Sequence, residues 1–186
     1  MNSSGDISQS IIVPSSMVFF MWLIYFISFR FNLDFGMFGI LPREWLGLLG
    51  ILVGPLIHGG LVHLISNTFP LLFLGTALYY FYGNIASRVF VTCYFGTGVL
   101  VWLFARSTFH IGASGLIYGL AFFLFLSGVF RRDFISLIIS VVVVIVYGGL
   151  IWGILPSMPG ISWESHAAGA LVGGALSYHY RNVSAV

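Results

Sequence analysis

The chain contains the segment His110-Ile111-Gly112-Ala113-Ser114-Gly115-Leu116-Ile117-Tyr118-Gly119, in which a Gly-Xaa-Ser-Gly turn opens an apolar helix. We expect Ser114 to be the N-cap of that helix, where the helix dipole favours developing negative charge. Gly112 and Gly115 carry no side chains, so another group could approach the Ser114 hydroxyl closely. A capped helix start in a glycine-rich protein is the alternative, and the rest of the chain must decide between them.

The composition indicates a helical membrane protein. Of the 186 residues, 59% are hydrophobic and 6% are charged, whereas soluble domains carry about 25% charged residues. The apolar runs are too long and continuous for barrel strands, so the spans are expected to be helices. The net charge of +2 gives no reason to expect a nucleic-acid partner. Cys93 is the one cysteine, so an internal disulfide is excluded.

Six apolar runs are long enough to cross a bilayer, which takes about 20 residues. They predict an all-α bundle that forms one domain over residues 11–181, between a polar tail (1–10) and a short C-terminal tail (182–186). The tail before the first run has no basic residue, so a cleaved signal peptide is not expected. The expected spans are Ile11–Phe31, Leu61–Tyr82, Ile85–Ala105, Ser114–Phe130, Phe134–Leu155 and Trp163–Tyr180.

Residues 32–60 fit neither a span nor an ordinary loop. They are apolar, yet Pro42-Arg43-Glu44 and several glycines interrupt them. We expect an insertion that lies in the interfacial region of the lipid bilayer and partly dips into it; an unusually apolar loop is the alternative.

Arginine placement favours a cytoplasmic N-terminus. Cytoplasmic ends are expected to carry the excess of basic residues. That orientation places Arg88, Arg131, Arg132 and Arg181 in the cytoplasm, against Arg30, Arg43 and Arg106 on the outer face.

Three polar residues within the expected spans lie at one depth. Polar side chains are costly in lipid and are therefore candidates for function. At 1.5 Å per residue, Asn67, Ser114 and His166 lie about 24, 25 and 22 Å from the cytoplasmic ends of their helices. His63 shares the helix face of Asn67. All are expected near the outer face, and a small-residue stripe that begins at Gly169 would bring the sixth span against the fourth.

The polar segments, taken in order, resemble the rhomboid family of intramembrane serine proteases. The matching pieces are His58-Gly59-Gly60-Leu61-Val62-His63-Leu64-Ile65-Ser66-Asn67, Gly112-Ala113-Ser114-Gly115, Tyr118 and His166-Ala167-Ala168-Gly169. The match covers all six expected spans and is similar to the minimal six-helix bacterial form. In one departure, Arg43-Glu44-Trp45 stands where rhomboids often carry a Trp-Arg pair, so the anchoring of residues 32–60 does not follow from the resemblance.

The resemblance implies a serine endopeptidase that cleaves transmembrane protein substrates near the outer face of a bacterial inner membrane. Ser114 would be the nucleophile and His166 the general base. Asn67 and His63, with the Ser114 N–H, would form the oxyanion hole, and Tyr118 would pack against the imidazole. No cofactor or metal would be needed, and the fifth helix with its following loop would act as gate and cap. The supporting positions would be His58, Gly112, Gly115 and Gly169.

Three other functions are compatible with some of these residues. A proton-coupled transporter could use His63 and His166, but it would want carboxylates inside the spans, and the acidic residues lie in tails or loops or, like Glu164, at a helix start. A catalytically inactive relative could bind membrane clients, although Ser114 and His166 are both retained. A zinc site at His58 and His63 has no evident third ligand. Taken alone, His63 and Asn67 could each be a hydrogen-bond partner between helices. His58 could be a structural residue that forms a hydrogen bond.

Three further titratable residues are expected to take no part in the chemistry. Glu164 precedes His166 by two residues, and side chains at that spacing point to opposite helix faces. A carboxylate is also favoured there by the helix dipole. His110 and His179 lie near span ends as interfacial side chains. We therefore expect a Ser-His dyad without a catalytic acid.

Overall fold

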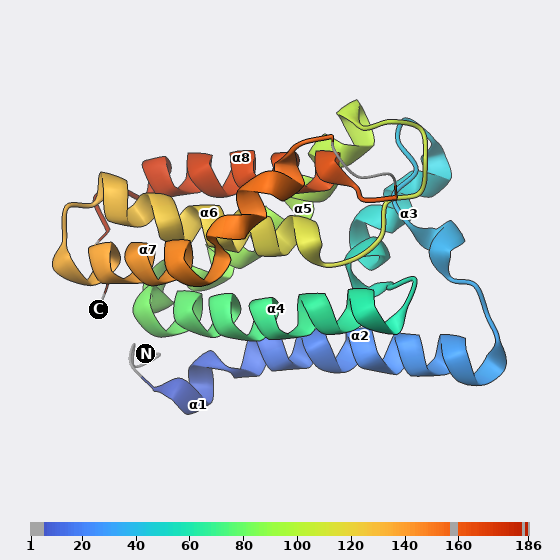
Figure 1. Cartoon of the computed structure of the whole chain (residues 1–186), viewed down its shortest axis with the longest axis horizontal. Coiled ribbons are helices and arrows are strands. Elements are labelled where there is room, and N and C mark those ends of the chain that lie inside the picture. The colour runs from blue at the N-terminus through green and yellow to red at the C-terminus, as the bar shows by residue number, and fades with distance from the viewer. Residues whose placement is uncertain (1–5, 157–159, 184, 186) are drawn as a thin grey trace.

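The computed structural model describes residues 6–156, 160–183 and 185, and its named elements are all helices (Figure 1). The long helices lie roughly along the long axis of the molecule, and α3 lies at the end where α2 finishes. The elements are α1 (Ile7–Ser10), α2 (Ile12–Phe31), η1 (Gly36–Phe38), α3 (Trp45–Val53), η2 (Gly54–Leu56), α4 (Leu61–Phe81), α5 (Gly83–Phe104), α6 (Ser114–Phe130), α7 (Phe134–Tyr147), η3 (Gly148–Ile154) and α8 (Trp163–His179).

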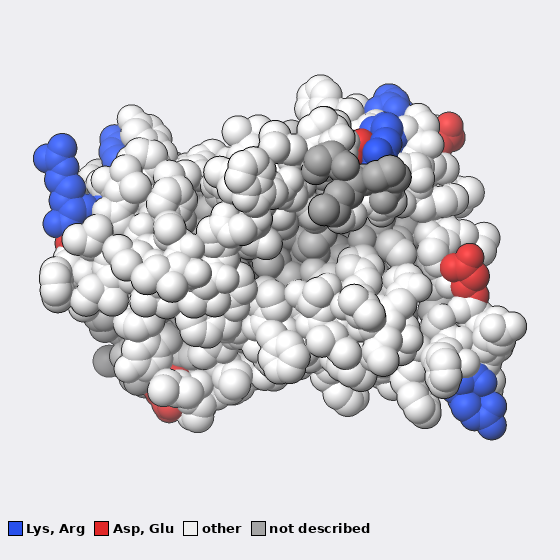
Figure 2. Space-filling view, in the orientation of Figure 1, with Lys and Arg blue, Asp and Glu red and all other residues white. Residues whose placement is uncertain are grey.

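Four helical stretches are long and apolar enough to cross a membrane: Ile7–Phe31, Leu61–Phe81, Gly83–Phe104 and Phe134–Ile154. Charged side chains gather towards the ends of the molecule and leave an uncharged band between them (Figure 2). The helices α6 and α8 have 17 residues each, or about 26 Å. Four of the six expected spans are thus candidate membrane helices by length and composition, and the count of six stays a prediction.

Most predicted helix ends lie within two residues of the structure, and two expected spans differ from it more. The first helical stretch begins at Ile7, inside the expected polar tail, because the Asp6 carboxylate accepts a hydrogen bond from the Ser8 N–H and caps α1. The fifth span is not one α-helix as expected. It changes to the 3₁₀ helix η3 at Gly148 and Gly149, since glycine is a poor α-helix former.

The helix α6 forms the centre of the bundle. It packs against α4, α5, α7 and α8. Its buried face includes Leu120, Phe123 and Leu124, each fully enclosed. The helix that begins with Ser114 is therefore held by neighbours on several sides, which fixes the position of its first turn.

Residues 32–60 fold into the short elements η1, α3 and η2, which are tied to the rest of the chain. The Arg43 guanidinium donates to the Ala105 carbonyl at 2.8 Å, and the Trp102 indole donates to the Glu44 carbonyl at 2.9 Å. Ile40 and His110 exchange two backbone hydrogen bonds of 2.9 Å. The insertion thus braces the loop that leads to Ser114. Its place at a membrane interface stays a prediction.

Candidate active site

Gly112 makes the turn before Ser114 possible. Its φ of +101° is a conformation that residues with side chains rarely adopt. Its N–H donates to the Gly54 carbonyl at 3.0 Å. A Cβ at this position would lie 2.6 Å from His63 Nε2. Gly112 is therefore required both by the backbone and by the close approach of the His63 ring.

Ser114 is the first residue of α6 rather than its N-cap, which corrects the expectation from sequence. Ala113 occupies the N-cap position with helical angles, φ −77° and ψ −1°, and no side chain caps the helix. The Ser114 hydroxyl is therefore free to donate to His166 Nε2, 2.9 Å away on α8.

Glycines hold α6 and α8 close enough for that contact. A Cβ at Gly169 would lie 2.0 Å from the Gly115 carbonyl oxygen, and one at Gly173 would lie 2.0 Å from the Gly119 carbonyl oxygen. Gly115 has its own reason to lack a side chain, because its Cβ would lie 2.8 Å from Thr97 Cγ2. Gly115 thus serves helix packing, and the open approach to the Ser114 hydroxyl that was expected from it stays a prediction.

His166 is held by a ring on one side and a carbonyl on another. The Tyr118 ring stacks on the imidazole, with centroids 4.1 Å apart and planes 4° apart. His166 Nδ1 donates to the Gly153 carbonyl at 2.8 Å. Because a carbonyl oxygen only accepts, Nδ1 carries the proton and Nε2 is left to accept from Ser114. The contact requires glycine in η3, since a Cβ at Gly153 would lie 1.9 Å from Tyr118 Oη.

Two residues of α4, His63 and Asn67, lie beside the turn that precedes Ser114. Asn67 is buried, and its side-chain amide donates to the His63 carbonyl at 2.9 Å. An amide group has a second N–H. A Cβ at Gly112 would lie 3.8 Å from Asn67 Nδ2, so the amide approaches the turn. His58 lies behind His63, with ring centroids 4.9 Å apart.

A cavity of about 1080 Å³ brings the predicted polar residues together. It extends between α4, the loop before α6, η3 and the start of α8, and it is lined by His63, Asn67, Ser114, Tyr118 and His166 among others. Asn67, Ser114 and His166, which were expected at one depth from three separate segments, therefore share one cavity. Gly115 and Gly169 are packing positions behind it.

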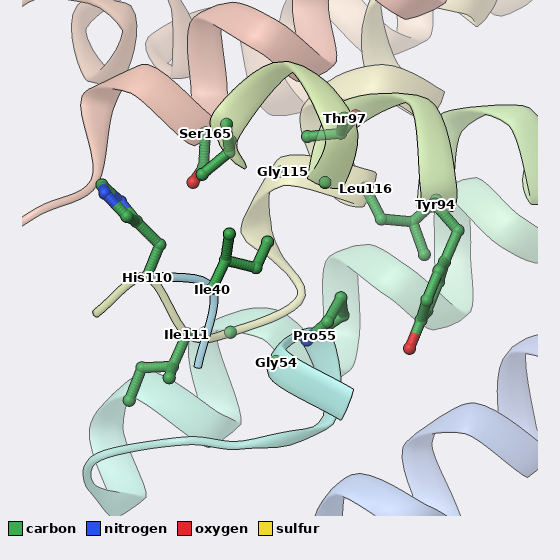
Figure 3. A pocket seen from close by; sticks show the side chains of 13 residues that line it. Ile40, Gly54, Pro55, Tyr94, Thr97, His110, Ile111, Gly115, Leu116 and Ser165 are labelled. Carbon is green, nitrogen blue, oxygen red and sulfur yellow. The ribbon is translucent and has the colours of Figure 1, made fainter. Parts of the chain in front are cut away.

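The loop before Ser114 is fastened to the start of α8, and His110 takes part. Burial lowers the pKa of His110 below its ordinary value. Its Nδ1 is 2.5 Å from the Ser162 hydroxyl and its Nε2 donates to the Arg106 carbonyl at 3.0 Å. In Figure 3 the His110 imidazole lies beside the ribbon that leads into α8. His110 is thus buried and structural, not an interfacial bystander as expected.

Glu164 is engaged away from the histidine. Its carboxylate pairs with the Arg106 guanidinium, with Nε and Oε1 3.2 Å apart. Arg106 also donates to the Ile161 carbonyl at 2.6 Å. This pair fixes the entrance of α8 two residues before His166.

A second, smaller cavity behind the serine turn is drawn in Figure 3. It has a volume of about 20 Å³ and is lined by Ile40, Pro55, Thr97 and Ser165 among others. That is space for about one water molecule. It cannot accommodate a polypeptide, so the larger cavity is the candidate site.

Sequence reasoning missed the Gly153 carbonyl and the buried role of His110. Gly153 lies among bulky apolar residues, and the absence of a side chain there was the available signal. His110 carried no signal, because its partner Ser162 is 52 residues away in the chain.

Comparison with known proteins identifies the family. A sequence model described as the rhomboid domain matches residues 42–183. An uncharacterized protein of Mycobacterium tuberculosis is 36% identical over 151 residues, which cover 75% of this chain and 62% of that protein. An uncharacterized protein of Mycobacterium leprae is 34% identical over 148 residues, covering 70% and 55%.

A plant protein is also similar. RHOMBOID-like protein 4 of Arabidopsis thaliana is 34% identical over 128 residues, which cover 66% of this chain and 31% of that protein. The chain thus spans less than two thirds of the length of these relatives. The family model covers the serine turn, both helices that carry the Ser114–His166 contact, and the apolar helices between them. This chain is an integral membrane protein of the rhomboid family.

Proposed function

We propose that the chain is a serine endopeptidase that cleaves transmembrane segments of other membrane proteins. The observation that carries the proposal is the 2.9 Å contact between the Ser114 hydroxyl and His166 Nε2 inside a cavity of an apolar helical bundle. We further propose six spans, a cytoplasmic N-terminus and a location in a bacterial inner membrane. The Ser114 end of the bundle would then face outwards.

Ser114 is the nucleophile and His166 is the general base. A serine hydroxyl needs a base to remove its proton as it attacks. His166 Nε2 accepts that proton, because Nδ1 already holds one towards Gly153. The resulting imidazolium lies against the face of Tyr118, where a ring stabilises a cation. Nε2 then returns the proton to the leaving amine.

The oxyanion of the tetrahedral intermediate needs hydrogen-bond donors on the side of α4. The backbone N–H of Ser114 is available because the first N–H groups of a helix have no intrahelical partner. The second N–H of Asn67 and a ring nitrogen of His63 complete the set. Preorganised donors of this kind give some of the largest effects in catalysis.

The substrate reaches the cavity from the side of η3. The cavity is lined by Pro70 of α4 and Leu150 of η3, so it lies between these two elements. The described residues of η3 include none that is buried. Displacement of η3 and the second half of α7 would admit a client helix, with its outer end unwound at Ser114.

Labelling with a fluorophosphonate probe in native membranes tests the proposal. The probe modifies a serine only when a base activates it. We expect labelling of the wild type, none in Ser114→Ala, and strongly reduced labelling in His166→Ala. Equal labelling of Ser114→Ala and wild type would overturn the assignment. Wild-type protein that stays folded yet takes no label would point to an inactive binder of membrane clients.

A further inference from the structure

A second groove adjoins the catalytic cavity at the Ser114 end of the bundle. Its volume is about 550 Å³, and it is formed by the end of α2, the loop over residues 32–36 and the segment before α4. It shares Gly59, Gly60 and Ile111 with the catalytic cavity. The two hollows therefore meet across the Gly59-Gly60 turn.

The two glycines of this turn are not explained by the fold. Gly60 is extended, with φ −177°, and Gly59 also lies outside the left-handed region. A Cβ at Gly60 would meet no atom within 4 Å, and one at Gly59 only Ile111 Cδ1 at 3.6 Å. Backbone and packing would therefore accept side chains here. Side chains at these two positions would, however, narrow the passage between the groove and the catalytic cavity.

The groove has an apolar lining that also carries polar groups, and its one charged side chain is negative. Asp34 is exposed in it. The salt bridge found in the described part of the chain joins Arg106 and Glu164, so Asp34 has no such partner there. Neither lysine nor arginine lines the groove. Ser28 and Asn32 add hydroxyl and amide groups.

A buried histidine with an unused nitrogen also lines the groove. His58 is 6% exposed, and within the described residues its Nε2 has no hydrogen-bond partner. Burial, with a smaller contribution from His63, lowers the pKa of His58 to about 4. His58 is therefore neutral at pH 7 and does not offset the Asp34 charge. An unpaired buried polar atom costs free energy, which a polar group bound in the groove could reduce.

We propose that the groove binds the part of the client polypeptide that emerges on the outer side of the scissile bond. This inference rests on the proposed protease function. The client segment leaves the catalytic cavity, crosses the Gly59-Gly60 turn in extended form and places a lysine or arginine near Asp34. At about 3.4 Å per residue, six extended residues cover about 20 Å. The groove thus selects clients with a polar, basic outer flank.

Cleavage of matched peptides in proteoliposomes tests this specificity. The probes are one synthetic transmembrane peptide whose six-residue outer flank carries two lysines, and the same peptide with two glutamates. In wild type we expect kcat/KM to favour the lysine flank by about two- to five-fold, the size of a surface charge pair. In Asp34→Asn the ratio should fall to about one. A ratio of one in wild type, or an unchanged ratio in Asp34→Asn, would overturn the proposal.

Variants of the turn provide a second measurement. Gly60→Val should also bring the ratio to about one, with Gly60→Ala between it and wild type. Gly149→Val is the matched control, because a Cβ at Gly149 also meets no atom within 4 Å. Asp6→Asn is the control for charge. Both controls should keep the wild-type ratio, and fluorophosphonate labelling reports that each variant is folded. A wild-type ratio in labelled Gly60→Val would contradict the path over the turn.

A binding measurement separates this proposal from the proposed function. A photoreactive residue at position 35, which lines the groove, is introduced into Ser114→Ala, and crosslinking to both peptides is measured. Stronger crosslinking to the lysine flank supports the groove even if wild type cuts neither peptide, in which case the protease function alone fails. Equal crosslinking of both flanks, with both peptides cut by wild type, rejects the groove and leaves the function standing.

Discussion

The α6–α8 pair and the α7–η3 segment border the same cavity and are packed in opposite ways. Where α6 meets α8, glycine backbones touch, and a Cβ at Gly169 or Gly173 would lie 2.0 Å from a carbonyl oxygen of α6. In α7 the buried residues all precede Val144, and η3 has none. A Cβ at Gly149 would meet no atom within 4 Å.

This difference in packing suits the two segments to different roles in the proposed site. Ser114 and His166 lie on the tightly packed pair, where a shift of one helix would require the other to move. The first half of α7 is also fixed, since a Cβ at Gly128 would lie 2.4 Å from Ser140 Cβ. From Val144 onwards no residue of α7 or η3 is buried, yet η3 supplies the Gly153 carbonyl to His166. In the proposed protease, the α6–α8 wall of the cavity would thus hold the geometry of Ser114 and His166, and the α7–η3 wall would control access to them.

Removal of either member of the pair should have the largest effect. Ser114→Ala and His166→Ala should each lower turnover of a transmembrane peptide by roughly a million-fold, or to background. The close glycine contacts between α6 and α8 are kept in both variants, so both should remain folded in the membrane. Turnover in proteoliposomes measures the effect, and wild-type turnover by Ser114→Ala would refute the assignment.

Asn67→Ala tests whether α4, like α6 and α8, contributes a group that must be held in place for catalysis. Loss of one oxyanion donor costs about a hundred- to a thousand-fold in kcat. We expect that loss with little change in thermal stability beyond that of a single buried hydrogen bond. An unchanged kcat would leave Asn67 as a helix-packing group that only bonds the His63 carbonyl.

Gly169→Val compares the two walls directly. The added side chain must push α8 away from α6, and a misplacement of about 1 Å can cost roughly a hundred-fold in rate. Overpacking should also lower stability by about 1–3 kcal/mol. Gly149→Val is the matched control on the loose wall and should change both quantities little. Similar losses in turnover and melting temperature for the two variants would remove the distinction between the walls.

Gly153→Ala tests the hydrogen bond by which η3 contacts His166 of α8. The added methyl would collide with Tyr118 Oη and displace η3, so the hydrogen bond to His166 Nδ1 would be lost. A neutral hydrogen bond contributes about 0.5–1.5 kcal/mol, so kcat should fall by about two- to ten-fold. Gly148→Ala, also in η3, is the control. A fall in kcat for both alike would mean that η3 acts by its mobility and not through this carbonyl.

Glu164→Gln should have the smallest effect. Glu164 pairs with Arg106 at the start of α8, whereas neutralising the acid of a true catalytic triad lowers kcat by about ten-thousand-fold. We expect turnover close to wild type, with a modest loss of stability from the weakened ion pair. A drop approaching the triad value would make Glu164 a catalytic acid.

The sequence by itself determined most of the helices and pointed to the residues that line the candidate site. The span Ser114–Phe130 was predicted with the bounds that the structure gives, because a glycine-rich turn precedes it and Arg131-Arg132-Asp133 follows it. The number of residues between each side chain and the cytoplasmic end of its helix predicted one common depth for Asn67, Ser114 and His166. Both inferences rest on local chemistry, the length of apolar runs and the fixed rise of a helix.

Only the tertiary structure decided what orients the histidine and what joins the cavities. A backbone carbonyl such as that of Gly153 has no side-chain identity to read, and its partner His166 is reached only when η3 folds back over the site. The position of Ser114 inside the first turn depends on the angles of Ala113. A side chain at Gly60 would meet open space, because no other segment of the folded chain packs against this position. These features arise from segments brought together in space, which periodicity along the chain does not encode.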